Sequence, residues 1–222
     1  MTGAAPATIR PYRAGDRDQV RHICFATGFM GDPVDWQWRD EASFADMFSS
    51  YYTDVEPESA SVVELDGRVA GYLLGCLDGQ RAFDPAAVAL RHVLRRGIAF
   101  RPGTAGIVWR TAWDGVGDLA RGRVRRDDLD FRDARWPAHL HIDLLPEARG
   151  GGAGRRLVTG WLEHLRERSV PGCHLTTFAE NAGALAFFRS TGFRLHGDPV
   201  LVPGLRTRAG GRMHSQVLVI DL

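Results

Sequence analysis

The chain has 222 residues, of which 44% are hydrophobic and 25% are charged, and its formal net charge is +1. These values are those of an ordinary globular protein, and we expect one domain over residues 1–222. The small net charge argues against a dedicated nucleic-acid binder, and no apolar run approaches the roughly 20 residues that span a bilayer. The N-terminal segment has no apolar signal-peptide core, and Cys24, Cys76 and Cys173 form no CxxC pair. We therefore expect a cytoplasmic protein without a disulfide framework or a zinc site.

The N-terminal residues predict a strand and two helices. A short strand at Ile9 precedes Asp16 and Gln19, whose spacing is that of a capping box at the start of a helix. Ser43 and Asp46 repeat the pattern before a second apolar helical repeat. We therefore expect two helices after the first strand.

A hairpin and a long insert follow. The run SVVELDGRVAGYLLG is two β-rich segments joined by Asp66-Gly67, which is a strong hairpin signal. Residues 78–135 are less regular and form the predicted insert. Within it, Asp84 as N-cap, Pro85 as first helical residue and Gly97 beyond the end predict one helix. A second helix is expected over AGIVWRTAWDGVGDLARG.

Regular structure returns with the strand AHLHIDLL, a glycine-rich turn and a helix. That helix carries one apolar stripe, formed by Leu157, Val158, Trp161, Leu162 and Leu165. The strand CHLTTF, the helix NAGALAFFRSTGF and the final strand MHSQVLVIDL follow, and we expect residues 198–212 to form a loop. The predicted fold class is α/β, with a mixed, twisted sheet of about six to seven strands and helices on both faces.

The glycine-rich turn places bare backbone and positive charge at a helix N-terminus. Four of the five residues from Gly150 to Gly154 are glycine, with Arg149 before them and Arg155 after them. Free N–H groups and the helix dipole favour a phosphate there. A P-loop would need lysine, which the chain lacks, and a dinucleotide fingerprint would need glycine where Arg155 stands. The remaining pattern is Arg-x-x-Gly-x-Gly, formed by Arg149, Gly152 and Gly154.

This pattern resembles motif A of the GNAT superfamily of acetyl-CoA-dependent N-acetyltransferases. A second motif about 32 residues later resembles the closing helix of the same family, and its matching residues are Asn181, Ala184, Phe187, Gly192 and Phe193. Phe188 stands where the family usually has tyrosine. The resemblance covers the chain except for roughly residues 78–135.

The resemblance implies that coenzyme A binds where two neighbouring parallel strands, residues 138–145 and 173–178, splay apart. The pantetheine arm would pair with the first strand near Leu144 and Leu145. The pyrophosphate would lie on the turn and helix start, formed by Gly150, Gly151, Gly152, Ala153, Gly154 and Arg155, next to Arg149. Asn181 and Phe188 would line the far wall. The expected reaction is acetyl transfer from acetyl-CoA to an amine by direct attack on the thioester.

A narrower resemblance concerns residues 141–146, HIDLLP, together with the insert. Both are similar to the acetyltransferase-like domain associated with O-GlcNAc hydrolases (O-GlcNAcase), although nothing in the chain resembles the hydrolase itself. Some members of that group are suspected of having lost catalysis. An acetyl-CoA-binding pseudoenzyme or interaction domain without turnover is therefore the alternative.

Three polar residues alternate on the strand before the turn. His139, His141 and Asp143 are spaced by two, which puts them on one face of the strand, where a polar face suggests a cleft. We expect Asp143 to be the general base, with His141 in reserve, and backbone amides around Leu145 to stabilise the oxyanion. Each side chain could instead simply bond loop backbone. No further ligands support a metal site at the two histidines.

The expected acceptor is an amine. It is either a small molecule or a protein or peptide. The insert and residues 198–212 are expected to form its wall, which favours a small amine. Tyr51 and Tyr52 could contact it, and the six tryptophans are expected in the core and at its rim. The oligomeric state is left as monomer or homodimer.

Overall fold

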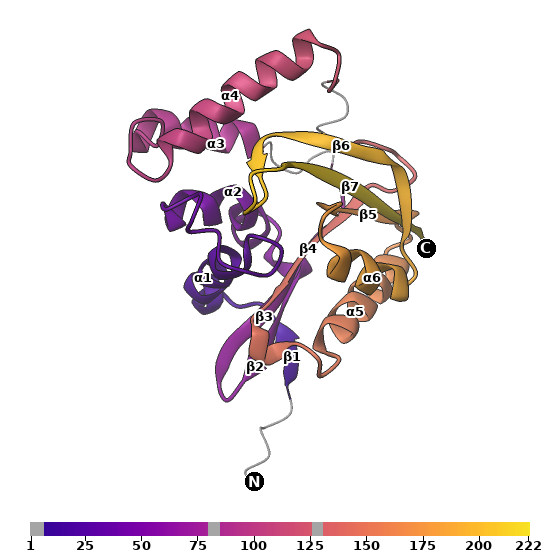
Figure 1. Ribbon diagram of the computed structural model, residues 1–222. Coiled ribbons are helices and arrows are strands. Elements are labelled where there is room, and N and C mark those ends of the chain that lie inside the picture. Colours follow the sequence, from indigo (N-terminus) through magenta and orange to yellow (C-terminus); the bar gives the residue numbers. More distant parts are fainter. Residues whose placement is uncertain (1–6, 80–84, 126–130) are drawn as a thin grey trace.

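A seven-stranded mixed sheet organises the molecule (Figure 1). The computed structural model describes residues 7–79, 85–125 and 131–222. The strand order is β1-β2-β3-β4-β5-β7-β6, and only the neighbours β4 and β5 are parallel. The strands are β1 (Thr8–Pro11), β2 (Ala60–Leu65), β3 (Arg68–Cys76), β4 (Ala138–Leu144), β5 (Gly172–Phe178), β6 (Arg194–Arg206) and β7 (Arg212–Asp221). The predicted fold class and strand number are confirmed.

Helices cover both faces of the sheet, as expected (Figure 1). They are α1 (Arg17–Thr27), α2 (Glu41–Asp54), α3 (Pro85–Arg96), α4 (Ala105–Ala120), α5 (Ala153–Glu167) and α6 (Ala182–Ser190). One core cluster joins α1 and α2 to the sheet through Ile23, Phe44 and Tyr72. A second joins α5 and α6 to the opposite face through Trp161 and Phe188. The whole predicted apolar stripe of α5 is buried.

The start of α1 differs from the predicted capping box. The Asp16 carboxylate accepts the Arg13 N–H at 2.8 Å and two hydrogen bonds from the Arg10 guanidinium. Gln19 accepts the Val69 N–H at 3.0 Å instead of bonding within its helix. Both side chains therefore tie α1 to the sheet, because tertiary partners compete with local capping.

Two other helix starts can be compared with the sequence. In α2 the N-cap is Asp40, whose carboxylate accepts the Ser43 N–H at 2.8 Å, so the predicted cap at Ser43 is wrong by three residues. Pro85 is the first residue of α3, as predicted, while Asp84 lies outside the described residues.

The segment predicted as a loop, residues 198–212, is mostly strand. β6 continues to Arg206, and its pairing with β7 is interrupted by irregularities between His196 and Val200 and between Leu201 and Arg206. Because β6 is an edge strand, it tolerates prolines and glycines that made it look like a loop. The insert helix α4 packs against it (Figure 1).

The tryptophans also depart from expectation. Trp38, Trp136 and Trp161 are buried, but Trp109 and Trp113 are exposed on α4. The prediction that all six lie in the core or at its rim is therefore wrong for α4. Within the three described ranges, no helix is long and apolar enough to cross a membrane.

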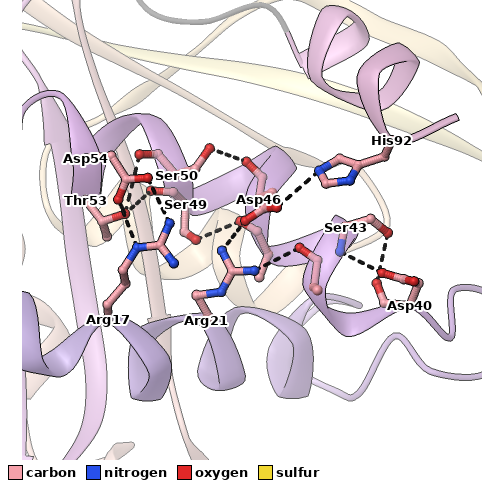
Figure 2. Close-up of polar contacts among 12 residues, drawn as sticks. Arg17, Arg21, Asp40, Ser43, Asp46, Ser49, Ser50, Thr53, Asp54 and His92 are labelled. Carbon is pink, nitrogen blue, oxygen red and sulfur yellow. Dashed lines mark hydrogen bonds and ion pairs between the residues drawn. The ribbon is translucent and has the colours of Figure 1, made fainter. Parts of the chain in front are cut away.

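Two arginine–aspartate pairs join α1 to α2 (Figure 2). Arg21 binds Asp46 and also donates to the Ala42 carbonyl at 3.0 Å, and His92 of α3 reaches the same Asp46 carboxylate at 3.2 Å. This pair is partly buried. The second pair, Arg17–Asp54, has an N–O distance of 2.8 Å and is exposed.

The two pairs give a matched test of burial. We expect Asp46→Ala to lower the free energy of unfolding by about 1–3 kcal/mol, because it removes the acceptor of His92 and of one nitrogen of the partly buried Arg21 guanidinium. Asp54→Ala should cost at most about 1 kcal/mol, because exposed ion pairs are weak. Urea unfolding of both variants measures the difference, and equal losses would contradict this view of the α1–α2 contact.

Candidate functional site

The parallel strands β4 and β5 separate shortly after they begin. They pair only at Ala138–Cys173 and His139–His174, whereas β4 pairs with β3 from His139 to Leu144. Among the residues that the structure describes, the edge of β4 that faces β5 is therefore unpaired beyond His139. Donor directions alternate along a strand. Because Leu145 donates to the Ala70 carbonyl on the β3 side at 2.8 Å, the amides of Ile142 and Leu144 point into the opening.

Leu145 offers no free backbone group to the opening between β4 and β5. Its N–H bonds Ala70, and its carbonyl accepts the Ala148 N–H at 2.9 Å. A ligand lying along β4 would meet the backbone of Leu144 and only the side chain of Leu145. Of the amides around Leu145, those of Ile142 and Leu144 are therefore the ones that face the opening.

The glycine turn connects this opening to the start of α5. Gly150 and Gly152 both have φ of +78°, a conformation that favours glycine. A Cβ at Gly150, Gly151 or Gly152 would meet nothing within 4 Å, so the backbone is open to a ligand. The first hydrogen bond of α5 runs from Arg156 N–H to the Gly152 carbonyl. The amides of residues 153–155 therefore precede the helical ladder and suit an anion.

Gly154 has another role. A Cβ there would lie 3.2 Å from Leu144 and 3.3 Å from Phe187, so Gly154 allows α5 to approach β4 and α6 closely. The two flanking arginines are held by the protein. Arg149 donates to the carbonyls of Leu144 and Gly31 at 2.9 and 2.7 Å, and Arg155 binds Ser190 on α6 at 3.0 Å. These neutral partners leave the positive charge of both arginines beside the turn.

The far side of the opening carries the other predicted residues. Asn181 caps α6, and its side-chain oxygen accepts the Ala184 N–H at 3.0 Å. Phe188 is buried among the aromatic rings of Phe187 and Phe193, with centroids 5.1 and 5.8 Å away. A phenyl ring at this position offers no proton donor.

The polar residues of β4 share one face, as their spacing predicts. His139 contacts Tyr52 of α2 through Nδ1 and Oη at 2.8 Å, and His141 Nδ1 lies 3.1 Å from the Phe48 carbonyl. His141 Nε2 lies 3.1 Å from Asp143 Oδ2. The structure thus brings His141 and Asp143 together and gives His139 a different neighbourhood.

Tyr72 completes the group, and the sequence reasoning missed it. It lies opposite Asp143 in the β3–β4 register, and its hydroxyl donates to Asp143 Oδ2 at 2.6 Å. Burial and the nearby carboxylate raise the pKa of Tyr72 well above its usual value, so its proton stays in place. Burial opposes protonation of His141, but the Asp143 charge together with the hydrogen bonds to Asp143 and the Phe48 carbonyl raises the pKa of His141. The Asp143 carboxylate therefore has one fixed donor and one titrating partner.

The His141 shift gives a pH prediction. A histidine whose folded pKa is raised stabilises the fold below its unfolded pKa of about 6.5 and loses this contribution as pH rises through the folded value. We expect the native protein to lose more unfolding free energy than His141→Gln when pH rises above about 6.5. Burial and neighbouring histidines hold the pKa of His139 well below its usual value, so His139 is neutral in both proteins over this range. Urea unfolding at several pH values measures the effect, and parallel curves for the two proteins would disprove it.

A cavity of about 620 Å³ lies on the same side of the sheet, bordered by Phe131, His196 and Val217. The Phe131 ring contacts His174, and His174 contacts His139, each with centroids 5.0 Å apart. The cavity is therefore linked to His139 through two ring contacts, and its lining comes from β6, β7 and the insert. Within the described ranges, no group of three or more His, Cys, Asp or Glu side chains could hold a metal ion.

Comparisons with known proteins agree with this geometry. Residues 119–193 match the acetyltransferase (GNAT) family. A 55-residue segment, 25% of this chain and 18% of the relative, is 36% identical to mycothiol acetyltransferase from Streptomyces griseus subsp. griseus. The solved structure of SsHAT is similar over 97% of this chain and 98% of its own, with a TM-score of 0.68 and 27% identity.

A third relative was solved with a ligand. The structure of yncA from Salmonella typhimurium, with its cofactor acetyl-CoA, is similar over 97% of this chain and 94% of its own, with a TM-score of 0.54 and 14% identity. That identity supports the fold alone. The chain has the GNAT fold, and its residues 119–193 match the model of the acetyltransferase (GNAT) family.

Proposed function

We propose that the protein is an N-acetyltransferase that moves an acetyl group from acetyl-CoA to an amine. The opening between β4 and β5 carries this proposal, because it leads from an anion-binding turn to a carboxylate–imidazole pair. Acetyl-CoA is the cofactor of the GNAT family. The three cysteines are buried free thiols, which supports the proposed cytoplasmic location, and we propose that residues 1–222 act as one domain.

The residues at the opening fit coenzyme A. The amides of residues 150–155 and the α5 dipole would hold the pyrophosphate, with Arg149 and Arg155 adding positive charge. The free amides of Ile142 and Leu144 would pair with the pantetheine arm, and Asn181 and Phe188 would form the far wall. When bound, acetyl-CoA supplies an activated acetyl group on a thiol that can leave.

The chain's own residues would handle the proton and the developing charge. Asp143 would take a proton from the acceptor ammonium, directly or through a water, because a protonated amine has no lone pair with which to attack. His141 Nε2, 3.1 Å from the carboxylate, would accept that proton in turn or act as the reserve base. Tyr72 would hold the carboxylate in position. A β4 amide facing the opening would stabilise the oxyanion.

Phe188 means that no tyrosine at this position protonates the departing sulfur. A thiol has a pKa of about 8.5, so a thiolate leaves tolerably near neutral pH. The missing acid should slow the reaction, by roughly 10²-fold at the low end of general-acid contributions, without abolishing it. Proton removal from the amine is therefore the step that most needs a side chain.

The acceptor would approach from the α2 side of the sheet. The cavity beside Phe131 and His196 and the contact between α4 and β6 support an enclosed groove, which favours a small amine over a protein tail. The narrower resemblance to the O-GlcNAcase-associated domain stays a proposal. It is the reason to test the pseudoenzyme alternative directly.

Two experiments test the proposal. Thermal-shift titration should show stabilisation by acetyl-CoA and none by NAD or ATP; the reverse would remove the acetyl-CoA assignment. A panel of small amines, amino sugars and N-terminal peptides is then tested for acetyl-CoA-dependent mass gain. Small amines should be acetylated fastest, and faster acetylation of peptides would contradict the enclosed groove. Binding without mass gain on any acceptor would favour the pseudoenzyme.

A further inference from the structure

The insert helix α4 exposes most of its large apolar residues and turns several charged side chains toward the sheet. Its inner face meets the edge strand β6 through charged groups. Asp114 accepts the Gly204 N–H at 3.0 Å and pairs with Arg206 at 2.6 Å. Arg110 donates to the Gly204 carbonyl at 2.7 Å. One turn on, the buried carboxylate of Asp118 binds Arg212.

These contacts attach most of the length of α4, while Ile107 and Val108 near its start pack against the core. The Asp114 and Arg110 side chains satisfy backbone groups of an edge strand that would otherwise be open to pairing. Beyond Val108, charged side chains occupy the side of α4 that faces the sheet.

The outer face carries those residues instead. Trp109, Trp113 and Val116 follow one another at helical spacing and are 51%, 75% and 65% exposed, and Phe100, 79% exposed, contacts the Trp109 ring at 6.4 Å. A single exposed aromatic residue is ordinary, but a continuous stripe of this kind marks an interaction site. The helix also contains three glycines, which lower its intrinsic stability and increase its need for packing on both faces.

The stripe has the spacing of a helix that packs on another helix. Ala105, Trp109, Ala112, Val116 and Leu119 recur at intervals of four and three residues. In an antiparallel pair centred on Ala112, Ala105 would oppose Leu119 of a second copy and Trp109 would oppose Val116. Small residues would therefore meet large ones, and the two copies of Ala112 would allow close approach at the axis.

The available area is sufficient for such a pair. At about 150–250 Å² for each aromatic side chain, Phe100, Trp109 and Trp113 leave on the order of 300–500 Å² in water. Two copies, with Val116 and Leu119 added, reach the roughly 1,000 Å² of total buried surface that a specific interface needs. We propose that the exposed face of α4 binds the same face of a second copy of this chain, forming a symmetric homodimer.

Sedimentation velocity of the native chain and two single variants tests this dimer. The native chain should be dimeric at micromolar concentration. Val116→Arg should weaken the dimer by at least about tenfold, because the arginine charge would lose water against Trp109 of the second copy, where Val116 makes an apolar contact. Val55, also 65% exposed but just beyond the C-terminal end of α2, provides the control, and Val55→Arg should leave the dimer intact. Trp113→Ser gives a second disruption without added charge.

Cross-linking provides an independent readout. The native cysteines are buried, so a new surface cysteine would be the reactive one. Under mild oxidation, Ala112→Cys should form a disulfide-linked dimer and Val55→Cys should not. A native chain that stays monomeric into the millimolar range would overturn the proposal. So would a dimer that survives both Val116→Arg and Trp113→Ser, because it would use another surface or partner face.

Discussion

Asp143→Asn is expected to lower kcat by about 10²–10⁴-fold, the usual contribution of a general base, while the affinity for acetyl-CoA stays nearly unchanged. Asparagine keeps the shape and still accepts the 2.6 Å hydrogen bond from Tyr72, but it cannot take a proton from the acceptor ammonium. Steady-state kinetics with the best amine of the acceptor screen give kcat. Calorimetric titration gives the affinity.

Asp66→Asn is the matched control. Asp66 lies in the β2–β3 turn with φ of +48°, a conformation that asparagine also adopts, so its turnover should equal that of the native chain. Unchanged turnover in Asp143→Asn would remove Asp143 from the mechanism and make His141 the base. In that case, His141→Gln, the variant of the pH stability test, should lower kcat more than Asp143→Asn does.

The second large effect concerns the glycine turn. Gly151→Asp is expected to weaken acetyl-CoA binding by about 10- to 100-fold, because a carboxylate would stand beside the bound pyrophosphate. Gly151 is the suitable position: an added Cβ meets nothing within 4 Å, and its φ is outside the left-handed region that Gly150 and Gly152 occupy. Isothermal titration calorimetry measures the affinity.

Gly151→Ala separates charge from size. It should bind acetyl-CoA nearly as well as the native chain and unfold at the same temperature. Gly154 is unsuitable for this comparison, because substitution there would also push against Leu144 and Phe187. Native-like affinity in Gly151→Asp would show that the phosphates lie elsewhere.

The sequence was most informative where local chemistry decides the structure. Glycine and N-cap signals located the turn before α5 and the start of α6 at Asn181, because both depend on backbone conformation over a few residues. Alternation along β4 placed His141 and Asp143 on one face, since a strand has a period of two.

Contacts between distant segments could not be predicted in this way. Tyr72 meets Asp143 only because β3 and β4 pair in one register, across an insert that separates them by 61 residues from Cys76 to Ala138. Gln19 looked like a capping residue, but Val69 on the sheet competes for it. The hydrogen bond from the Leu145 N–H to the Ala70 carbonyl also follows from strand pairing. Because this bond turns the Leu145 amide toward β3, the amides of Ile142 and Leu144 are the ones that face the opening.

The surface of the insert was the least predictable part. Prolines and glycines suggested a loop at residues 198–212, because sequence alone does not show that β6 lies at the edge of the sheet. Trp109 and Trp113 were expected inside, since large apolar residues are usually buried. They are exposed because charged side chains on the opposite face of α4 form ion pairs with β6 and β7.

The most direct test of the central claim is amine-dependent release of free CoA thiol from acetyl-CoA, measured for the native chain and for Asp143→Asn. We predict that the native chain releases CoA in proportion to the acetylated amine detected by mass spectrometry. Asp143→Asn should bind acetyl-CoA with the same affinity and release CoA at least about 10²-fold more slowly. Saturable acetyl-CoA binding with no amine-dependent thiol release by the native chain would contradict the claim that this opening is a working active site.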